Sequence, residues 1–284
     1  MKPSAFDYER PTQLAEVLAL LERHGADARV IAGGQSLVPL MNLRMVAPAV
    51  LVDLNRVAGL AGIALQDGRL RIGAMTRQHL LLTDALVAAH APLLARAMPH
   101  VGHVQTRNRG TVGGSLSHAD PSAELPVSMV ALDAVMRVSS TGGERTIPAR
   151  SFFEDILTTG LLPGEVLTAI DIPLAPPGTR VAFTEFARRH GDFAIASCAA
   201  QFVPGGPRGG QLDVALGGVA NIPHFCAGLC AALAAAGFAR DAIGDAVARE
   251  VAALSPMEDL HADAALRSQL ARVALTDCLK EVLP

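Results

Sequence analysis

Two glycine pairs, each inside an apolar run, place the strongest constraint on what this chain can fold into. The first pair lies in Arg29-Val-Ile-Ala-Gly-Gly-Gln-Ser-Leu37, and the second in Gly110-Thr-Val-Gly-Gly-Ser-Leu-Ser-His-Ala-Asp-Pro121. Because glycine has no Cβ, a ligand can come close to the backbone N–H groups beside it. Loops of this kind hold phosphates with few charged side chains. We therefore expect one long, two-ended phosphorylated cofactor between the two loops.

The usual nucleotide-binding signatures are absent from both motifs. Neither contains GxGxxG or GK[ST], which argues against NAD-type and ATP-type sites. The second motif is the more specific, because hydroxyl and carboxyl side chains follow its glycines: Ser115, Ser117, Asp120 and Glu124. A turn and helix start is the alternative role for Asp120, and a charge that complements a helix dipole is the alternative for Glu124.

Composition narrows the class of protein. The chain has 284 residues, of which 50% are hydrophobic and 18% charged, as expected for a globular protein of two domains or one large one. A net charge of −3 without any Lys/Arg block argues against a nucleic-acid partner. No apolar run is long enough to span a membrane, and the N-terminus does not resemble a signal peptide, so we expect a cytoplasmic protein.

The cysteines and histidines do not predict a metal site. The four cysteines form no CxxC pair and no iron–sulfur array, which favours buried thiols. His100 and His103 lie three residues apart, but no carboxylate or thiolate nearby completes a ligand set.

Hydrophobic periodicity predicts a mixed order of helices and strands. A strand, the first glycine pair, a short helix and another strand follow one another, which indicates a small α/β unit. Helices are expected over 12–24, 37–43, 76–90, 92–98 and 122–133, and strands over 29–32, 50–54, 69–74, 135–139, 145–147 and 165–172. The proline-rich segment 173–178 predicts a boundary between domains 1–175 and 176–284. Beyond it we expect strands at 181–186, 193–202 and 212–216, with a turn at 204–210 before the last, and then helices.

A third cluster, Glu185-Phe-Ala-Arg-Arg-His-Gly-Asp-Phe-Ala194, places two arginines and an aromatic residue around a turn. It is either a solvated hairpin end or the rim of a cofactor or partner surface. Phe193 is expected to be exposed, because a tight turn cannot easily bury it.

The three motifs at 32–37, 111–126 and 188–194 together resemble the FAD-binding medium subunit of molybdenum hydroxylases, the family of aerobic carbon monoxide dehydrogenase and bacterial xanthine dehydrogenase. The resemblance covers essentially the whole chain. It implies an α+β fold: a vanillyl-alcohol-oxidase-type FAD-binding domain of two α/β subdomains, then a smaller domain with a three-stranded antiparallel sheet and helices. Several relatives carry a lysine where this chain has Thr184-Glu185, so that contact is not carried over.

By position, the resemblance implies FAD contacts along both glycine motifs and beyond, with no catalytic residue and no metal on this chain. The expected FAD-binding residues are Ile31, Ala32, Gly33, Gly34, Gln35, Ser36, Leu37, Gly110, Thr111, Gly113, Gly114, Ser115, Ser117, Asp120, Glu124 and Leu161.

The resemblance also implies a role in electron transfer. Electrons would come from 2Fe-2S clusters on a small subunit, pass through FAD here, and leave to an external acceptor. A large subunit would carry the molybdenum cofactor, in a dimer of heterotrimers. A stand-alone flavoenzyme and a non-enzymatic nucleotide-binding module remain as alternatives. Neither the substrate nor the final acceptor is encoded in a recognisable motif.

Overall fold

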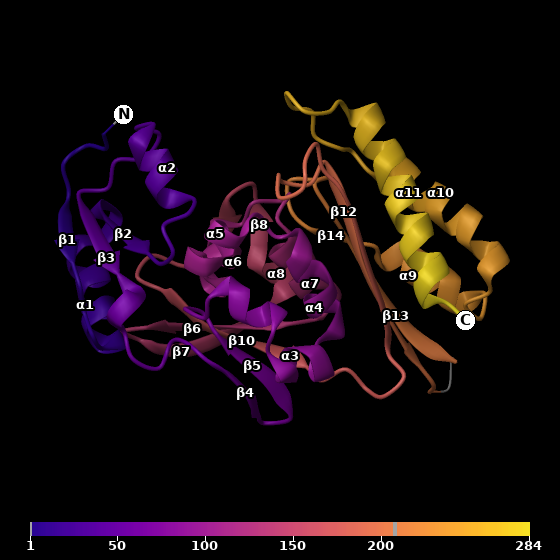
Figure 1. Cartoon of the computed structure of the whole chain (residues 1–284), viewed down its shortest axis with the longest axis horizontal. Coiled ribbons are helices and arrows are strands. Elements are labelled where there is room, and N and C mark those ends of the chain that lie inside the picture. The colour runs from indigo at the N-terminus through magenta and orange to yellow at the C-terminus, as the bar shows by residue number, and fades with distance from the viewer. Residues whose placement is uncertain (1, 207–208) are drawn as a thin grey trace.

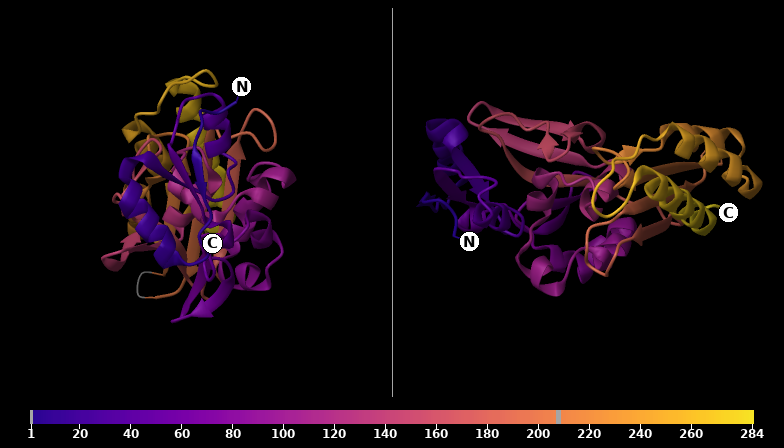
Figure 2. Two further views of the ribbon diagram at one scale, coloured as in Figure 1. Left: turned by 90° about the vertical axis from the view of Figure 1, so that its left-hand side faces the viewer. Right: turned by 90° about the horizontal axis from the view of Figure 1, so that it is seen from above.

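The structure is a computed structural model that describes residues 2–206 and 209–284. Three sheets follow one another along the long axis of the molecule, in chain order from the N-terminal end (Figure 1). The N-terminal sheet and the C-terminal helices lie at opposite ends, as the view from above also shows (Figure 2, right). The predicted α+β fold, with two N-terminal units and a C-terminal sheet-and-helix unit, is confirmed.

The N-terminal unit is a parallel three-stranded sheet in the order β1-β3-β2. Its predicted order of strand, short helix and strand forms, and apolar residues of α1, β2 and β3 are buried together in its core. β1 was not predicted: its three residues are exposed and carry no apolar pattern. The elements are β1 (Asp7–Glu9), α1 (Leu14–His24), β2 (Ala28–Ile31), α2 (Leu37–Asn42) and β3 (Val50–Asp53).

The second unit is a five-stranded antiparallel sheet in the order β4-β5-β10-β6-β7. The predicted hairpin at 135–147 forms its β6–β7 edge, and the central strand β10 comes last in the sequence. The elements are β4 (Ile63–Gln66), β5 (Arg69–Gly73), α3 (Ala85–His90), α4 (Pro92–Ala97), α5 (Val104–Arg109), α6 (Val112–His118), α7 (Glu124–Ala131), β6 (Val135–Ser140), β7 (Gly143–Pro148), α8 (Ala149–Phe152), β8 (Phe153–Asp155), β9 (Thr158–Thr159) and β10 (Val166–Pro173).

Two predicted helices differ in the structure. The stretch 76–90 is not one helix: the Thr76 hydroxyl bonds the backbone of Gly62 at 3.0 Å, a 3-10 turn follows, and Asp84 caps the short α3. Ser122 does not cap α7, because its N–H donates to Asp120 Oδ1 at 2.9 Å in a local turn. In both places a side chain bonds nearby backbone and shortens the helix that apolar spacing predicted.

The C-terminal unit is an antiparallel sheet in the order β11-β12-β13-β14. The three predicted strands form, and the two-residue β14 adds a fourth that was not predicted. α11 packs on one face of the sheet and α7 of the second unit packs on the other. Residues 207 and 208, in the turn predicted at 204–210, lie outside the described residues. The elements are β11 (Arg180–Phe186), β12 (Ala196–Pro204), β13 (Gly210–Gly217), β14 (His224–Phe225), α9 (Ala227–Ala235), α10 (Ile243–Ala253) and α11 (Ala264–Val282).

The predicted boundary at 175/176 falls between β10, which ends at Pro173, and β11, which begins at Arg180. We keep the division into domains 1–175 and 176–284 as a proposal. Among the described residues, no helix is both long and apolar enough to cross a membrane.

Candidate cofactor site

The first glycine motif forms the turn between β2 and α2. Ile31 ends β2, Gly34 adopts φ +72°, and α2 begins at Leu37 directly after Ser36. The backbone conformation at Gly34 is one that other residues rarely adopt. At Gly33 the constraint is space, because a Cβ there would collide with the carbonyl of Arg109 and the Cα of Gly110. The first motif therefore lies directly against the start of the second.

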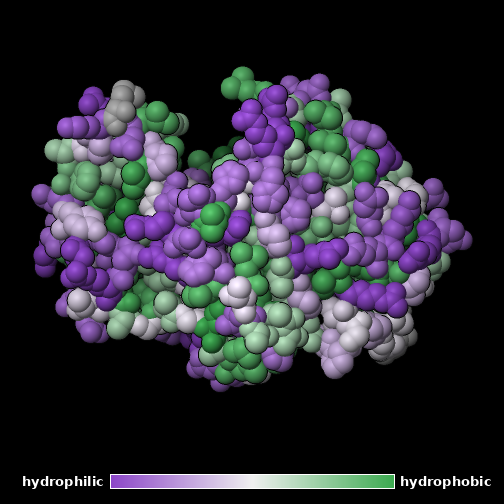
Figure 3. Space-filling view, in the orientation of Figure 1, coloured by the Kyte–Doolittle hydropathy of each residue, from purple (hydrophilic) through white to green (hydrophobic). Residues whose placement is uncertain are grey.

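Four backbone donors at this turn are free of partners in the described part of the chain. Within residues 2–206 and 209–284, the N–H groups of Gly33, Gly34, Gln35 and Ser36 make no hydrogen bond to the chain. The first three of these residues line a cleft of about 460 Å³. A space-filling view shows the molecule hollowed between the N-terminal lobe and the rest (Figure 3). Clustered N–H groups in a concave wall suit a phosphate or diphosphate.

The other cleft walls come from β1 (Tyr8), from the end of β3 and the turn after it (Asp53 and Asn55), and from the end of α5 (Arg109). The complete lining comprises Tyr8, Ile31, Ala32, Gly33, Gly34, Gln35, Val38, Pro39, Asp53, Asn55 and Arg109. No histidine or cysteine is among these residues.

The second glycine motif is not a loop. Thr111 is the N-cap of α6, and its hydroxyl accepts the Gly114 N–H at 3.1 Å. The Gly113 N–H donates to the Ala74 carbonyl at 2.7 Å, so the expectation that this amide is free for a ligand is wrong. Gly113 is needed for packing instead, because a Cβ there would lie 2.5 Å from the Ala74 Cβ. Gly110 is likewise enclosed, with its N–H bonded to the Thr106 carbonyl at 2.6 Å.

The two motifs nevertheless meet in space. A Cβ at position 114 would lie 3.6 Å from the Ala32 Cβ and 2.6 Å from the Thr111 hydroxyl oxygen. Residues 31–35 and 109–114 thus face one another, although 109 is the only position of the second group in the cleft lining.

The remaining expected residues extend away from the cleft along α6 and α7. Ser115, Asp120 and Leu161 are half-buried, and Ser117 is exposed. The Leu157 N–H donates to the Ala119 carbonyl at 3.2 Å, which holds the segment before Leu161 against the end of α6. The structure therefore groups these residues beside α6, outside the cleft lining.

Sequence reasoning missed a polar clamp that joins the two motifs. Asn55 Nδ2 donates to the Ala32 carbonyl at 2.9 Å, and Arg77 Nη2 donates to Asn55 Oδ1 at 2.6 Å. The Arg77 guanidinium also donates to the Arg109 carbonyl. Asp53 and Asn55 could have been found, because they follow β3 at the carboxyl edge of a parallel sheet, where ligands commonly bind. No local signal marks Arg77.

Charges in and beside the cleft favour an anion. Burial lowers the pKa of Arg77, and the positive charge of Arg109 lowers it further. Burial raises the pKa of Asp53, but hydrogen bonds from Tyr8 and Asn55 outweigh this and leave it below its usual value. The Asp53 carboxylate in the lining is thus already bonded by donors, and the positive charges of Arg109 in the lining and of Arg77 beside it can attract phosphate.

A second polar feature lies where α7 meets the C-terminal sheet. Glu124 begins α7 and is only 4% exposed, and burial raises its pKa to about 7. Burial and the charge of Glu124 raise the pKa of Glu185, on β11, to about 8. The buried Glu185 Oε2 has no hydrogen-bond partner in the described chain. Neither carboxyl forms an ion pair within the described residues, although the Arg107 charge partly offsets the rise in the Glu124 pKa. Two buried carboxyl groups suit a ligand that brings hydroxyl or N–H donors.

Comparison with known proteins identifies the family. The family described as "FAD binding domain in molybdopterin dehydrogenase" matches residues 4–175, and "CO dehydrogenase flavoprotein C-terminal domain" matches residues 181–282. The chain is 48% identical to the 6-hydroxypseudooxynicotine dehydrogenase complex subunit alpha of Paenarthrobacter nicotinovorans, over 70% of this chain and 67% of that protein. It is 35% identical to the carbon monoxide dehydrogenase medium chain of Afipia carboxidovorans, over 97% and 96%.

A solved structure agrees across the whole fold. Carbon monoxide dehydrogenase from Hydrogenophaga pseudoflava, in a form that lacks the Mo-pyranopterin moiety, has a chain that superposes with a TM-score of 0.96 at 35% identity. The match covers 99% of this chain and 98% of that one. With a cleft of free backbone donors in the domain that carries the FAD family match, this chain belongs to the FAD-binding medium subunits of the molybdenum hydroxylases and is an oxidoreductase subunit.

Proposed function

We propose that this chain carries electrons from 2Fe-2S clusters of a small subunit, through FAD, to an external acceptor. A large subunit with the molybdenum cofactor oxidises the substrate in the same complex, which is a cytoplasmic dimer of heterotrimers. FAD supplies the redox chemistry, because it can exchange electrons one or two at a time. The observation that carries the proposal is the cleft whose wall presents the free N–H groups of residues 33–35.

The chain's own residues would hold FAD in two regions. The N–H groups of residues 33–36 bind the diphosphate, and Arg109 balances its charge. The Arg77–Asn55 clamp keeps the first motif at a fixed distance from the second. Because neither histidine nor cysteine lines the cleft, we propose that FAD is held without a covalent bond.

The second region would hold the hydroxyl-bearing part of FAD. Glu124 would accept hydrogen bonds from FAD hydroxyl groups. The same part of FAD would run along Thr111, Ser115, Ser117 and Asp120. Leu161 supplies an apolar contact to one of the rings. The burial of this carboxyl supports the role, because hydroxyl donors of a ligand would satisfy its oxygen atoms.

Substrate choice would lie on another chain. The two relatives compared above belong, by name, to dehydrogenases of carbon monoxide and of 6-hydroxypseudooxynicotine, which are chemically unlike. A fold retained between such enzymes supports a role in the shared electron path. We therefore propose no catalytic acid or base on this chain.

The partner surface would include the turn at 188–193. Phe193 is 56% exposed there, as predicted, and follows Arg188 and Arg189 by five and four residues in the sequence. Aromatic residues and arginine are enriched at the centres of protein interfaces.

The test is purification of the native complex and of this chain alone. We expect one FAD per chain, released by denaturation, with molybdenum and iron only in the complex. The isolated chain should reduce dyes but should not oxidise the complex's substrate. A chain that binds no flavin contradicts the cofactor site. A chain that turns over the substrate alone at the full rate would instead be a stand-alone flavoenzyme.

A further inference from the structure

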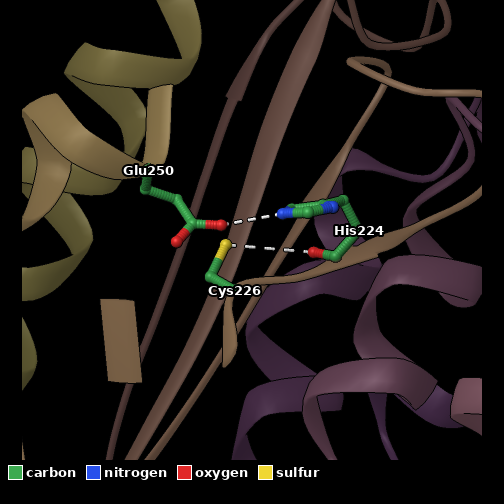
Figure 4. Close-up of side chains that lie close together, drawn as sticks. All are labelled: His224, Cys226 and Glu250. Carbon is green, nitrogen blue, oxygen red and sulfur yellow. Dashed lines mark hydrogen bonds and ion pairs between the residues drawn. The ribbon is translucent and has the colours of Figure 1, made fainter. Parts of the chain in front are cut away.

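A second site lies in the C-terminal unit, on the short strand that sequence reasoning missed. His224 is in β14, Cys226 directly precedes α9, and Glu250 is in α10. Their side chains converge from these three elements (Figure 4). The intervening Phe225 packs elsewhere, against the core of the second unit and under the Arg150 guanidinium, 3.6 Å from its ring centre. Alternation along an extended backbone thus turns the imidazole and the thiol towards the same carboxylate.

The distances are close to those of a metal centre. His224 Nε2 lies 2.8 Å from Glu250 Oε1, and one ligand atom from each of the three residues lies within 4.8 Å of the others. Ligand atoms bonded to one zinc ion at about 2.0–2.3 Å are separated by roughly 3–4 Å. Small side-chain shifts would therefore bring all three into contact with one ion.

The surroundings hold the ligands in place. The second carboxylate oxygen, Glu250 Oε2, accepts the Leu229 N–H of α9 at 3.0 Å, which orients the carboxylate. Cys226 is fully buried, whereas the His224 side chain is 36% exposed and leaves one side open to water. This combination gives three protein ligands and room for a water molecule as the fourth.

We propose that His224, Cys226 and Glu250 bind one zinc-class divalent cation. A thiolate and a carboxylate cancel the two positive charges, so a neutral centre forms at this half-buried position. Nitrogen, sulfur and oxygen ligands together favour zinc over magnesium or calcium, which take oxygen ligands alone. The ion would tie β14 to α9 and α10, separate from the FAD cleft. The alternative is a metal-free arrangement in which Glu250 caps α9 and pairs with His224.

The experiment uses the purified full-length chain with its FAD, stripped of metal by dialysis against a chelator and titrated with Co²⁺. We expect a thiolate-to-cobalt charge-transfer band that saturates at one equivalent and disappears when Zn²⁺ is added. Cys226→Ser should abolish the band, and His224→Asn should weaken cobalt binding by about tenfold or more. FAD content should not change in either variant.

Matched controls are Cys230→Ser, a thiol one turn further along α9, and His261→Asn, an exposed imidazole. Both should retain the wild-type titration. If Cys226→Ser fails to fold, His224→Asn decides the question through thermal melting: Zn²⁺ should raise the Tm of the wild type and leave that of His224→Asn unchanged. No charge-transfer band in the wild type, or equal binding and Tm response in His224→Asn, would overturn the proposal.

Discussion

Replacing Glu124 by glutamine isolates the effect of one buried carboxyl group on stability. The residue is 4% exposed, and burial raises its pKa from the usual 4.5 to about 7. The folded apoprotein therefore binds the proton of the Glu124 carboxyl group more tightly than the unfolded chain does. The stabilisation from the protonated carboxyl is complete below pH 4.5 and is lost as the pH rises to about 7.

The pKa change sets the size of the effect. At about 1.4 kcal/mol for each pKa unit, the carboxyl of the apoprotein loses about 3 kcal/mol of stabilisation across that range. Glutamine has a similar shape and does not titrate. Relative to wild type, Glu124→Gln apoprotein should thus become more stable as the pH rises. Removing the Glu124 charge also lowers the pKa of Glu185. This change likewise makes the variant more stable relative to wild type as the pH rises.

Urea denaturation of the flavin-free protein at several pH values between 5 and 8 measures this difference. Glu22→Gln, at an exposed position of α1, is the control and should show no such trend. A stability difference between Glu124→Gln and wild type that stays constant from pH 5 to pH 8 would refute the reasoning.

FAD affinity gives an independent measurement: loss of a charged acceptor should weaken it by about tenfold or more. Unchanged affinity would restrict Glu124 to a structural role.

Three further predictions concern the cleft and the partner surface. Gly33→Ala should lose FAD, since its Cβ collides with the Arg109 carbonyl, whereas Gly244→Ala, with open space around its Cβ, should keep one flavin per chain. Arg77→Ala removes the hydrogen bonds to Asn55, which holds the Ala32 carbonyl, and to the Arg109 carbonyl. It should raise the Kd for FAD by about tenfold or more in a flavin titration, and an unchanged Kd would show that the clamp is dispensable. The double variant Arg188→Ala/Phe193→Ala should slow flavin reduction by the iron–sulfur partner in stopped-flow measurements while FAD content stays constant. Wild-type reduction kinetics would exclude this turn from the interface.

The sequence predicted those parts of the fold in which local pattern and tertiary packing agree. The strand before Gly33, the helix after it and the strand at 50–53 formed as expected, and the agreement is clearest at 50–53, where all four residues are buried. β1 and β14 were missed, because two or three residues are too few to show a period. Their partners are chosen by tertiary pairing, with β1 against β3 and β14 against β13.

Long-range contacts explain what sequence reasoning missed at the site. Arg77 reaches Asn55 and the Arg109 carbonyl, both more than 20 residues away, and only the folded chain brings them together. The same limitation hid the cluster of His224, Cys226 and Glu250, because the carboxylate comes from another helix. A search for short ligand spacings cannot detect a group whose last member lies 26 residues from the first.

The glycines show why a motif can be recognised correctly while its physical reason is wrong. At Gly34 the missing Cβ permits a left-handed backbone beside N–H groups that the described chain leaves free, which suits the proposed cofactor site. At Gly113 the missing Cβ lets α6 pack against Ala74, and the N–H is already bonded. Displacement of α6 would also move Gly114 away from Ala32, so a change at Gly113 would reach the proposed site. A substitution at Gly113 should therefore lower stability and FAD content together, whereas one at Gly34 should affect FAD content more than the fold.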